Sequence, residues 1–110
     1  MTPRTVKEVR LTLGLVALVS EEDFEMVSYY KWHANPCHLG ADGKNRSPKY
    51  YARSMVMGYM HRFILDAPRE KVVDHIDGNS LNNQRYNLRL VTREENIALS
   101  NKRRSEEPFL

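Results

Sequence analysis

The stretch that decides the fold spans residues 72–101 and reads VVDHIDGNSLNNQRYNLRLVTREENIALSN. A short apolar run at its start delivers Asp74 and His75, and a second apolar run begins at Leu88. The segment between them is rich in Asn, Asp, Gly and Ser, the residues that favour turns. The pattern therefore predicts two strands joined by an irregular loop, whose amide side chains can bond to the loop's own backbone.

A helix is predicted directly after the second strand. Thr92 and Glu95 form the T-x-x-E pattern of a capping box, which places the start of the helix at Arg93. Asn96 then falls in the first turn of this helix or just after it, on the rim of the strand pair. Groups able to bind a metal ion or to move a proton could therefore meet where two strands pack on one helix.

The rest of the chain carries weaker patterns. Apolar periodicity predicts the following elements: strands at 9–13 and 15–19, a helix over 21–31, a strand at 49–57 and a short helix at 60–65. Gly14 would join the first two strands in a tight hairpin turn. Ser20 with Asp23 resembles a helix N-cap and its partner, and Trp32 is expected to anchor the core. The segments 33–38 and 40–48 are expected to be loops.

The expected fold class is α+β, in one domain of residues 1–110. It comprises an N-terminal hairpin and helix within a subregion of residues 1–66, a middle strand, and a ββα unit over 67–104. A chain of 110 residues can bury one modest core. No apolar run approaches the ~20 residues of a membrane span, and the charged start MTPRTVKEVR is unlike a signal peptide. The single Cys37 excludes an intramolecular disulfide and suits a reducing cytoplasm.

The net charge of +3 is unevenly distributed along the chain. Residues 1–40 carry a net charge of −1, whereas residues 41–104 carry +6. A mild basic excess by itself indicates ordinary solubility. Concentrated around a candidate metal site, it favours a partner that bears phosphates.

Two other metal sites are poorly supported. His33, Cys37 and His38 lie close in sequence, but they lack the further ligands that a zinc site needs. A calcium-binding EF-hand loop that starts at Asp74 would need a bidentate Glu at its twelfth position, which is Arg85. His61 has two interpretations: a structural histidine hydrogen-bonded beneath the active site, or a contact to DNA or to a substrate phosphate.

The pattern D-H-x-D-G-N-x-x-N-N-x-x-x-N-L-R-x-V-T-x-x-x-N resembles the HNH, or ββα-metal, endonucleases. It is most similar to the phage and intron-encoded homing enzymes in which Asn replaces the last His of the name. His75 matches the first H, Asn87 the N and Asn96 the final position. The resemblance covers about thirty residues at unbroken spacing, a match that is far more specific than a lone D-H pair.

The resemblance implies a mechanism and a set of site residues. The residue that matches His75 is the general base that takes a proton from the attacking water. Those that match Asp74 and Asn96 bind one divalent cation, for which oxygen ligands favour Mg²⁺ or Mn²⁺. The residue that matches Asn87 is structural, because its amide holds the loop between the strands.

The expected activity is hydrolysis of phosphodiester bonds in DNA, most simply double-stranded DNA, in a bacterial or phage-infected cytoplasm without a membrane partner. The candidate phosphate contacts are Arg89, Arg93, Lys44, Arg46, Lys102 and Arg103. Solvated charge explains the loop residues equally well, and the basic end of the last helix also complements the helix dipole. Nicking or double-strand cleavage, and a monomer or a homodimer, are both compatible with one site per chain. Two alternatives stay open: a non-catalytic DNA-binding module with a relic unit, and a nuclease for RNA or structured nucleic acid.

Overall fold

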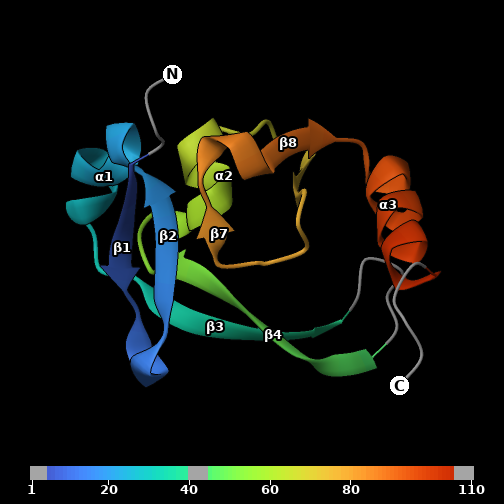
Figure 1. Ribbon diagram of the computed structural model, residues 1–110, viewed down its shortest axis with the longest axis horizontal. Helices are drawn as coiled ribbons and strands as arrows, with labels where there is room; N and C mark the ends of the chain where they lie inside the picture. Colours follow the sequence, from blue (N-terminus) through green and yellow to red (C-terminus); the bar gives the residue numbers. More distant parts are fainter. Residues whose placement is uncertain (1–4, 40–44, 106–110) are drawn as a thin grey trace.

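The computed structural model describes residues 5–39 and 45–105, which form a mixed α+β fold of helices and small sheets. This confirms the expected fold class. Figure 1 shows the N-terminal hairpin and its helix on one side and the last helix on the other, with the long middle strands between them. Within the described ranges, no helix has the length and apolarity needed to cross a membrane.

The N-terminal hairpin is present, with different bounds from those expected. β1 (Val6–Arg10) and β2 (Val16–Ser20) pair in antiparallel fashion. The prediction that the first strand extends to Leu13 is wrong, because a 3₁₀ turn occupies Thr12–Gly14. Leu13 has a φ of 62°, a left-handed conformation that cannot continue a strand.

The first helix, α1 (Glu21–Ser28), forms as predicted but ends before the expected residue 31. The capping role expected for Ser20 and Asp23 is wrong. Ser20 Oγ accepts a hydrogen bond from the backbone N–H of Arg85 at 3.0 Å, and the Asp23 carboxylate accepts from the Arg85 guanidinium at 2.8 Å. Both side chains therefore tie α1 to the C-terminal half of the chain instead of capping their own helix.

The middle of the chain is a long hairpin of β3 (His33–Leu39) and β4 (Asn45–Ser54). The loop expected at 33–38 is wrong, and the last four residues of the loop expected at 40–48 belong to β4. The other residues of that loop lie outside the described ranges. Pro36 is what suggests a loop, but β3 is an edge strand of its sheet, where a missing N–H is tolerated.

A tight turn separates β4 from β5 (Gly58–Tyr59), so β4 ends at Ser54 and not at the expected Met57. The short helix α2 (Met60–Leu65) follows at once, at the bounds that the sequence predicted. Its buried face closes the main core.

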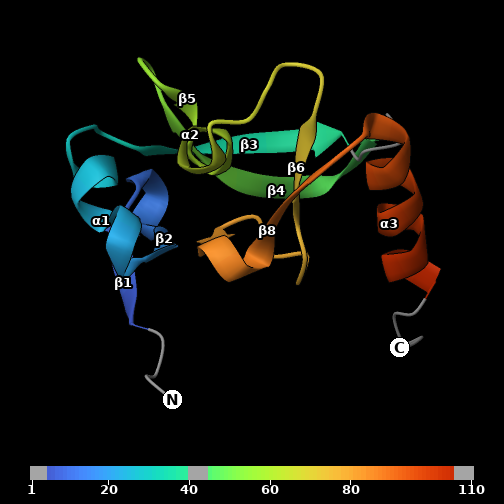
Figure 2. The ribbon, with the colours of Figure 1, turned by 90° about the horizontal axis from the view of Figure 1, so that it is seen from above.

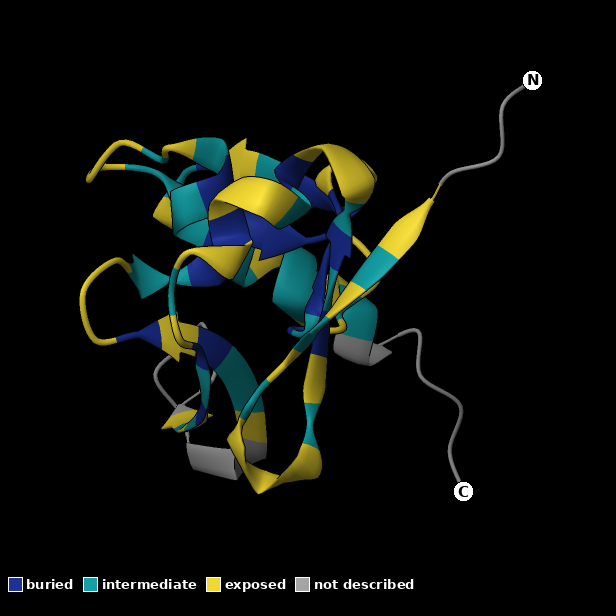
Figure 3. Cartoon of the chain, turned by 90° about the vertical axis from the view of Figure 1, so that its left-hand side faces the viewer, coloured by how far each residue is buried: buried dark blue, intermediate teal, exposed yellow. Residues whose placement is uncertain are grey.

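That core lies where the N-terminal hairpin, α1, α2 and the middle strands meet, seen as the dark interior of Figure 3. Its buried members are Ala17, Val19, Val27, Trp32, Ala52, Met60, Ile64, Val73 and Leu88. Trp32 is an anchor, as expected: it is buried, and its indole N–H donates to the carbonyl oxygen of Val27 at 2.8 Å.

The C-terminal unit confirms the sequence prediction in each of its elements. β6 (Val72–His75) pairs antiparallel with β8 (Leu88–Val91), and α3 (Arg93–Ser105) follows, as Figure 2 shows from above. The capping box is formed: Thr92 N–H donates to Glu95 Oε1 at 2.8 Å, and Glu95 N–H donates to Thr92 Oγ1 at 3.1 Å.

One strand pairing has no signal in the sequence. β7 (Asn82–Asn83), within the loop between β6 and β8, runs parallel to β2, with Leu18 opposite Asn82 and Val19 opposite Asn83. The loop is therefore an extension of the N-terminal sheet, and its position depends on residues more than sixty positions earlier in the chain.

Candidate active site

His75 ends β6, and its side chain is buried. Its Nε2 lies 2.7 Å from Oδ1 of Asn83, a residue with no exposed surface. Because an amide oxygen only accepts hydrogen bonds, this contact is compatible with the tautomer that carries its proton on Nε2 and keeps a lone pair on Nδ1. Asn83 is held by the pairing of β7 with β2, so the N-terminal sheet orients the imidazole.

The surroundings of His75 favour the neutral imidazole. Burial lowers its pKa below the ordinary value of 6.5, since the charged form loses solvation. The Asn83 hydrogen bond and the negative charges of Asp74 and Asp77 act in the opposite direction but do not outweigh burial. Near neutral pH the ring is therefore unprotonated at one nitrogen, the state that a general base requires.

An aromatic cluster backs the imidazole. The ring of His61 lies edge-on to His75 with 5.0 Å between centroids, and Tyr51 contacts both rings at 5.6 and 6.1 Å. His61 is buried, and burial followed by the proximity of His75 lowers its pKa to about 3. This placement beneath His75 favours the structural interpretation of His61, because a buried neutral ring is poorly suited to holding a phosphate. Its Nδ1 has no hydrogen-bond partner within the described residues, so ring packing holds the side chain in place of the expected hydrogen bond.

Asp74 precedes His75 and points to the other face of β6. Its carboxylate is almost fully buried, with 4% of its side chain exposed, and it is matched by two guanidinium groups. Arg89, directly opposite in the strand register, donates to Oδ2 at 2.9 Å, and Arg103 approaches both carboxylate oxygens at 3.4 Å. In this state both arginines, expected at DNA phosphates, compensate the charge of Asp74.

Gly78 provides the space for the Arg103 side chain. A Cβ at this position would lie 3.0 Å from Cδ of Arg103, and the φ of +78° is itself one that side-chain-bearing residues rarely adopt. The loop after β6 therefore packs against the C-terminal part of α3, where Arg103 passes Gly78 to reach Asp74.

Asn96 lies on the same helix as Arg103, seven residues earlier, which is two turns along one face of α3. The half-buried positions on this helix include both residues, whereas Glu95 and Lys102 are exposed. Because Arg103 reaches Asp74 from this face, Asn96 shares the side of α3 that faces β6. Its backbone N–H donates to the carbonyl of Thr92 at 2.9 Å, so its side-chain amide is placed by a regular helix turn.

The donor chemistry of this face fits a hard divalent cation. Asp74 offers a carboxylate and Asn96 an amide oxygen, the ligand types that Mg²⁺ and Mn²⁺ prefer. Over residues 5–39 and 45–105, no three His, Cys, Asp or Glu side chains gather into a metal cluster. His33, Cys37 and His38 all lie on β3, and they are not among any such group in the described part of the chain. Two protein oxygens leave room for the water and phosphate oxygens that Mg²⁺ usually retains.

The loop between β6 and β8 is organised around Asn87. This buried amide accepts from the backbone N–H of Asp77 at 2.9 Å, and it donates to Asp77 Oδ1 at 2.8 Å and to the carbonyl of Asn82 at 2.9 Å. Partial burial alone would raise the pKa of Asp77, but hydrogen bonds from Asn82, the backbone of Asn79 and Asn87 lower it overall. The ionised carboxylate thus holds the loop that follows His75.

The remaining candidate phosphate contacts are less defined. Lys44 lies outside the described residues, as does the side chain of Arg46, although its backbone belongs to β4. Arg93 and Lys102 are exposed on α3. Lys49 adds a further cation to Lys44 and Arg46, the basic residues of the segment that the sequence suggested could lie along a DNA backbone. It is an exposed β4 residue whose Nζ lies 3.4 Å from the carbonyl of Gly78 and therefore beside the site.

Asn83 and Tyr51 have roles that the sequence does not indicate. By sequence Asn83 is only one of several loop amides, and its contact with His75 depends on the pairing of β7 with β2. The alternation of β4 does place Tyr51 on a different face from Ala52, but nothing local shows that this face meets His75.

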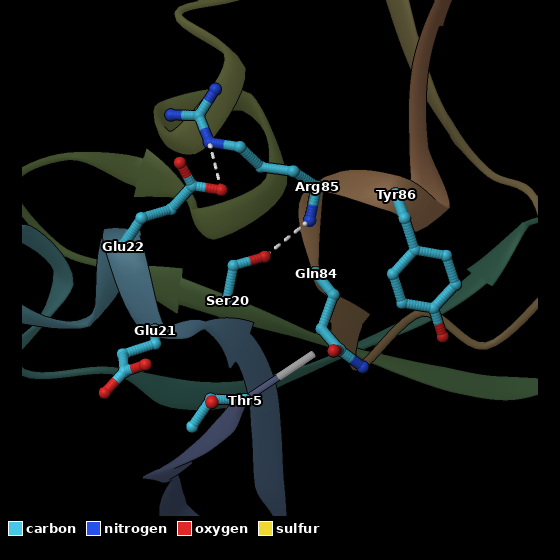
Figure 4. Close-up of a pocket in the computed structure, with 7 residues that line it drawn as sticks. All are labelled: Thr5, Ser20, Glu21, Glu22, Gln84, Arg85 and Tyr86. Atoms are coloured by element: carbon cyan, nitrogen blue, oxygen red, sulfur yellow. Dashed lines mark hydrogen bonds and ion pairs between the residues drawn. The ribbon is translucent and has the colours of Figure 1, made fainter. Parts of the chain in front are cut away.

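A separate hollow of about 280 Å³ lies at the joint between α1 and the loop. Figure 4 shows its lining residues, which come from the hairpin, the start of α1 and the segment after β7: Thr5, Ser20, Glu21, Glu22, Gln84, Arg85 and Tyr86. None of them belongs to the His75 cluster. Acidic side chains at one rim also make it unsuited to a phosphate backbone.

Comparison with known proteins gives a consistent result. The family model for HNH endonucleases matches residues 66–98. An uncharacterised HNH endonuclease of Acanthamoeba polyphaga mimivirus is 40% identical over 91 residues, which cover 76% of this chain and 42% of that protein. A prophage-derived protein of Bacillus subtilis, YosQ, named as an HNH homing endonuclease, is 43% identical over 53 residues, or 48% of this chain and 29% of its own. The chain thus spans less than half the length of these relatives. No solved structure matches.

Proposed function

The chain belongs to the HNH endonuclease family, and we propose that it cleaves DNA by metal-assisted hydrolysis of a phosphodiester bond, with His75 as the general base. The observation that carries this proposal is the 2.7 Å contact between His75 Nε2 and Asn83 Oδ1. It orients a neutral imidazole next to a buried carboxylate on the same strand, in the segment that the family model matches.

The base chemistry follows from the tautomer. With the ring proton on Nε2 and donated to Asn83, Nδ1 accepts a proton from the attacking water, and the imidazolium that forms keeps its bond to Asn83. His61 and Tyr51 pack on the ring and restrict its rotation. Positioning of this kind lowers the barrier because the reacting atoms need not search for their geometry.

Asp74 and Asn96 are the residues that would hold the cation. When bound, Mg²⁺ or Mn²⁺ would stabilise the negative charge that develops on the phosphate and on the leaving oxygen. A neutral amide is a poor ligand for soft metals, which favours these ions over zinc. Arg89 and Arg103 compensate the carboxylate in the state described, and they lie close enough to contact a phosphate that enters the site.

The substrate proposal depends on charge. The net charge of +6 over residues 41–104 and the exposed Lys49, Arg93 and Lys102 around α3 and β4 favour a nucleic acid backbone. YosQ is named as a homing endonuclease, and we propose double-stranded DNA as the preferred substrate of this chain. RNA, or binding without cleavage, would be compatible with the same charge distribution.

A plasmid cleavage assay tests the proposal. Supercoiled plasmid is incubated with the protein in Mg²⁺, in Mn²⁺ and in excess EDTA, in parallel with single-stranded DNA and RNA. We expect nicked or linear plasmid only with metal, and at least a ~10²-fold loss in the His75→Ala variant, the usual contribution of a general base. His38→Ala, an exposed histidine on β3, is the matched control and should retain activity.

Each alternative has its own outcome in this assay. Plasmid binding without cleavage under any metal condition would support a non-catalytic DNA-binding module. Cleavage of RNA alone would identify the protein as a ribonuclease. Full cleavage by His75→Ala, or cleavage that survives EDTA, would contradict the mechanism.

A further inference from the structure

The turn between β4 and β5 exposes a run of apolar side chains. Met55 is 86% exposed, Val56 79% and Met57 37%. Figure 2 shows this turn projecting from the body of the molecule beside α2. Three consecutive apolar residues at a projecting tip are uncommon on a soluble surface and typically mark a contact site.

The tip is ordered. Ser54, itself buried, accepts hydrogen bonds through Oγ from the backbone N–H groups of Val56 at 3.1 Å and Met57 at 3.2 Å. Gly58 closes the turn with a φ of +75°, a conformation that glycine adopts without strain. The apolar side chains are therefore presented on a fixed turn, so their insertion into a partner would cost little conformational entropy.

The tip is also connected to the candidate active site. Tyr59, two residues after Met57, contacts the rings of Tyr51 and His61, and His61 contacts His75. The tip and the candidate site are therefore linked through one continuous set of ring contacts.

The charge around the tip selects the partner. Arg53 and Lys49 are exposed on the same strand that leads to the turn, and the Arg53 guanidinium lies over the Tyr59 ring at 5.4 Å from its centroid. A second copy of the chain is disfavoured because three residues provide far less than the ~800 Å² per partner of a stable protein interface. A DNA duplex suits a contact of this size, since single apolar side chains inserted at a base step from the minor groove are enough to kink it.

We propose that Met55 and Val56 form an apolar wedge that enters the minor groove of the DNA bound at the site and unstacks one base step. Arg53 and Lys49 would contact the flanking phosphates. The proposal rests on the proposed function, because it requires a DNA duplex at the site. In this proposal the turn deforms the DNA. Deformation favours flexible base-pair steps, so it can select a sequence without any hydrogen bond to a base edge.

The test uses the whole chain and a mapped cleavage site. The nick made by the wild-type protein is located by run-off sequencing, and duplexes are made with 2-aminopurine at each position around it. Binding is measured in the His75→Ala background so that the duplex stays intact. We expect fluorescence at one step to rise severalfold on binding, and the added Met55→Ser and Val56→Ser changes to abolish the rise and weaken binding by about tenfold.

Tyr29→Ser is the matched control, because Tyr29 is 77% exposed at the end of α1 and lies outside the site. It should leave both signals unchanged, and unaltered thermal unfolding would show that the tip variant is folded. Unchanged fluorescence and affinity in the tip variant would overturn the wedge while leaving the proposed function intact. If the wild-type protein dimerises with increasing concentration and the tip variant does not, the wedge proposal is overturned and the tip binds a second copy of the chain. Absence of plasmid cleavage by the wild-type protein would instead contradict the proposed function itself.

Discussion

At the scale of single residues, the candidate base depends on neighbours that its own sequence motif does not contain. His75 is held by Asn83 from β7, by His61 from α2 and by Tyr51 from β4. Each contact removes freedom or solvent from the imidazole. Burial favours its neutral form, and the Asn83 hydrogen bond, which acts in the opposite direction, does not outweigh it. In an Asp-His pair without these neighbours, the imidazole would be exposed to solvent and neither tautomer would be favoured.

The burial of His61 predicts a pH-dependent stability. Its pKa is about 3 in the folded chain against about 6.5 when unfolded, so below pH 6.5 the unfolded state binds more protons and is favoured. We expect His61 to cost roughly 2 kcal/mol of unfolding free energy between pH 6.5 and pH 5. Urea titrations should show a smaller loss over this range for His61→Phe, which keeps an aromatic ring but cannot titrate. Parallel pH profiles for the two proteins would contradict the assignment.

The two arginines on Asp74 predict competition with the metal. Removing one cation by Arg103→Met should make the DNA-free protein bind Mn²⁺ about tenfold more tightly, because the carboxylate is less compensated. Isothermal titration calorimetry measures this without any cleavage. Arg93→Met is the control, with the same charge change on an exposed part of α3. Equal gains in Mn²⁺ affinity for the two variants would show that the gain comes from net charge alone and not from the contact with Asp74.

At the scale of elements, the joint between α1 and the loop before β8 connects the two halves of the chain. Asp23 is buried beneath the half-exposed Arg85, which bonds to it at 2.8–3.0 Å, and Ser20 holds the Arg85 backbone. The joint fixes β7 against β2 and thereby places Asn83 beneath His75. An interaction far from the chemistry therefore sets the geometry of the base.

Breaking this joint should destabilise the fold. Arg85→Met leaves the Asp23 charge buried and unpaired, and we expect a loss of about 2–4 kcal/mol in urea unfolding. The loss is near the lower end for buried pairs because the Arg85 side chain is 45% exposed. The second change Asp23→Leu should recover most of it, whereas Glu22→Gln, at a 4.0 Å contact on the surface, should cost less than ~0.5 kcal/mol. No recovery in the double variant would show that Asp23 has another role.

At the scale of the whole molecule, charge is segregated between the two halves. The N-terminal 40 residues carry −1, whereas residues 41–104, which contain the candidate site, carry +6. Such a distribution steers a polyanion toward the site and makes its binding depend on salt.

The salt dependence of DNA binding identifies which cations contact phosphates. In the His75→Ala background, anisotropy titrations at several salt concentrations give the log–log slope. Replacing Lys49, Lys102, Lys44 or Arg46 with Ala should each reduce the slope by ~0.9 if that residue neutralises one phosphate. Lys7→Ala is the control, since Lys7 lies over the Phe24 ring in the N-terminal half. An unchanged slope in any of the four variants would identify that residue as a solvated charge.

The C-terminal unit could be predicted from the sequence because its signals are local. The strand bounds at Val72–His75 and Leu88–Val91 and the start of α3 at Arg93 follow from short apolar runs, turn residues and a capping box. The same locality explains why the resemblance to a family is visible in the amino-acid sequence alone. The β3 strand escaped prediction because an edge strand with Pro36 has no local pattern, and its partner lies beyond a loop.

Sequence by itself thus determined the fold class, the ββα unit and the residues Asp74, His75, Asn87 and Asn96 as candidates. Only the tertiary structure decided what surrounds them: Asn83 and His61 at the imidazole, Arg89 and Arg103 at the carboxylate, and Arg85 with Asp23 behind the loop. The physical reason is range. Turn chemistry and capping act over a few residues, whereas the burial, tautomer and charge compensation of a site depend on groups brought together from distant parts of the chain.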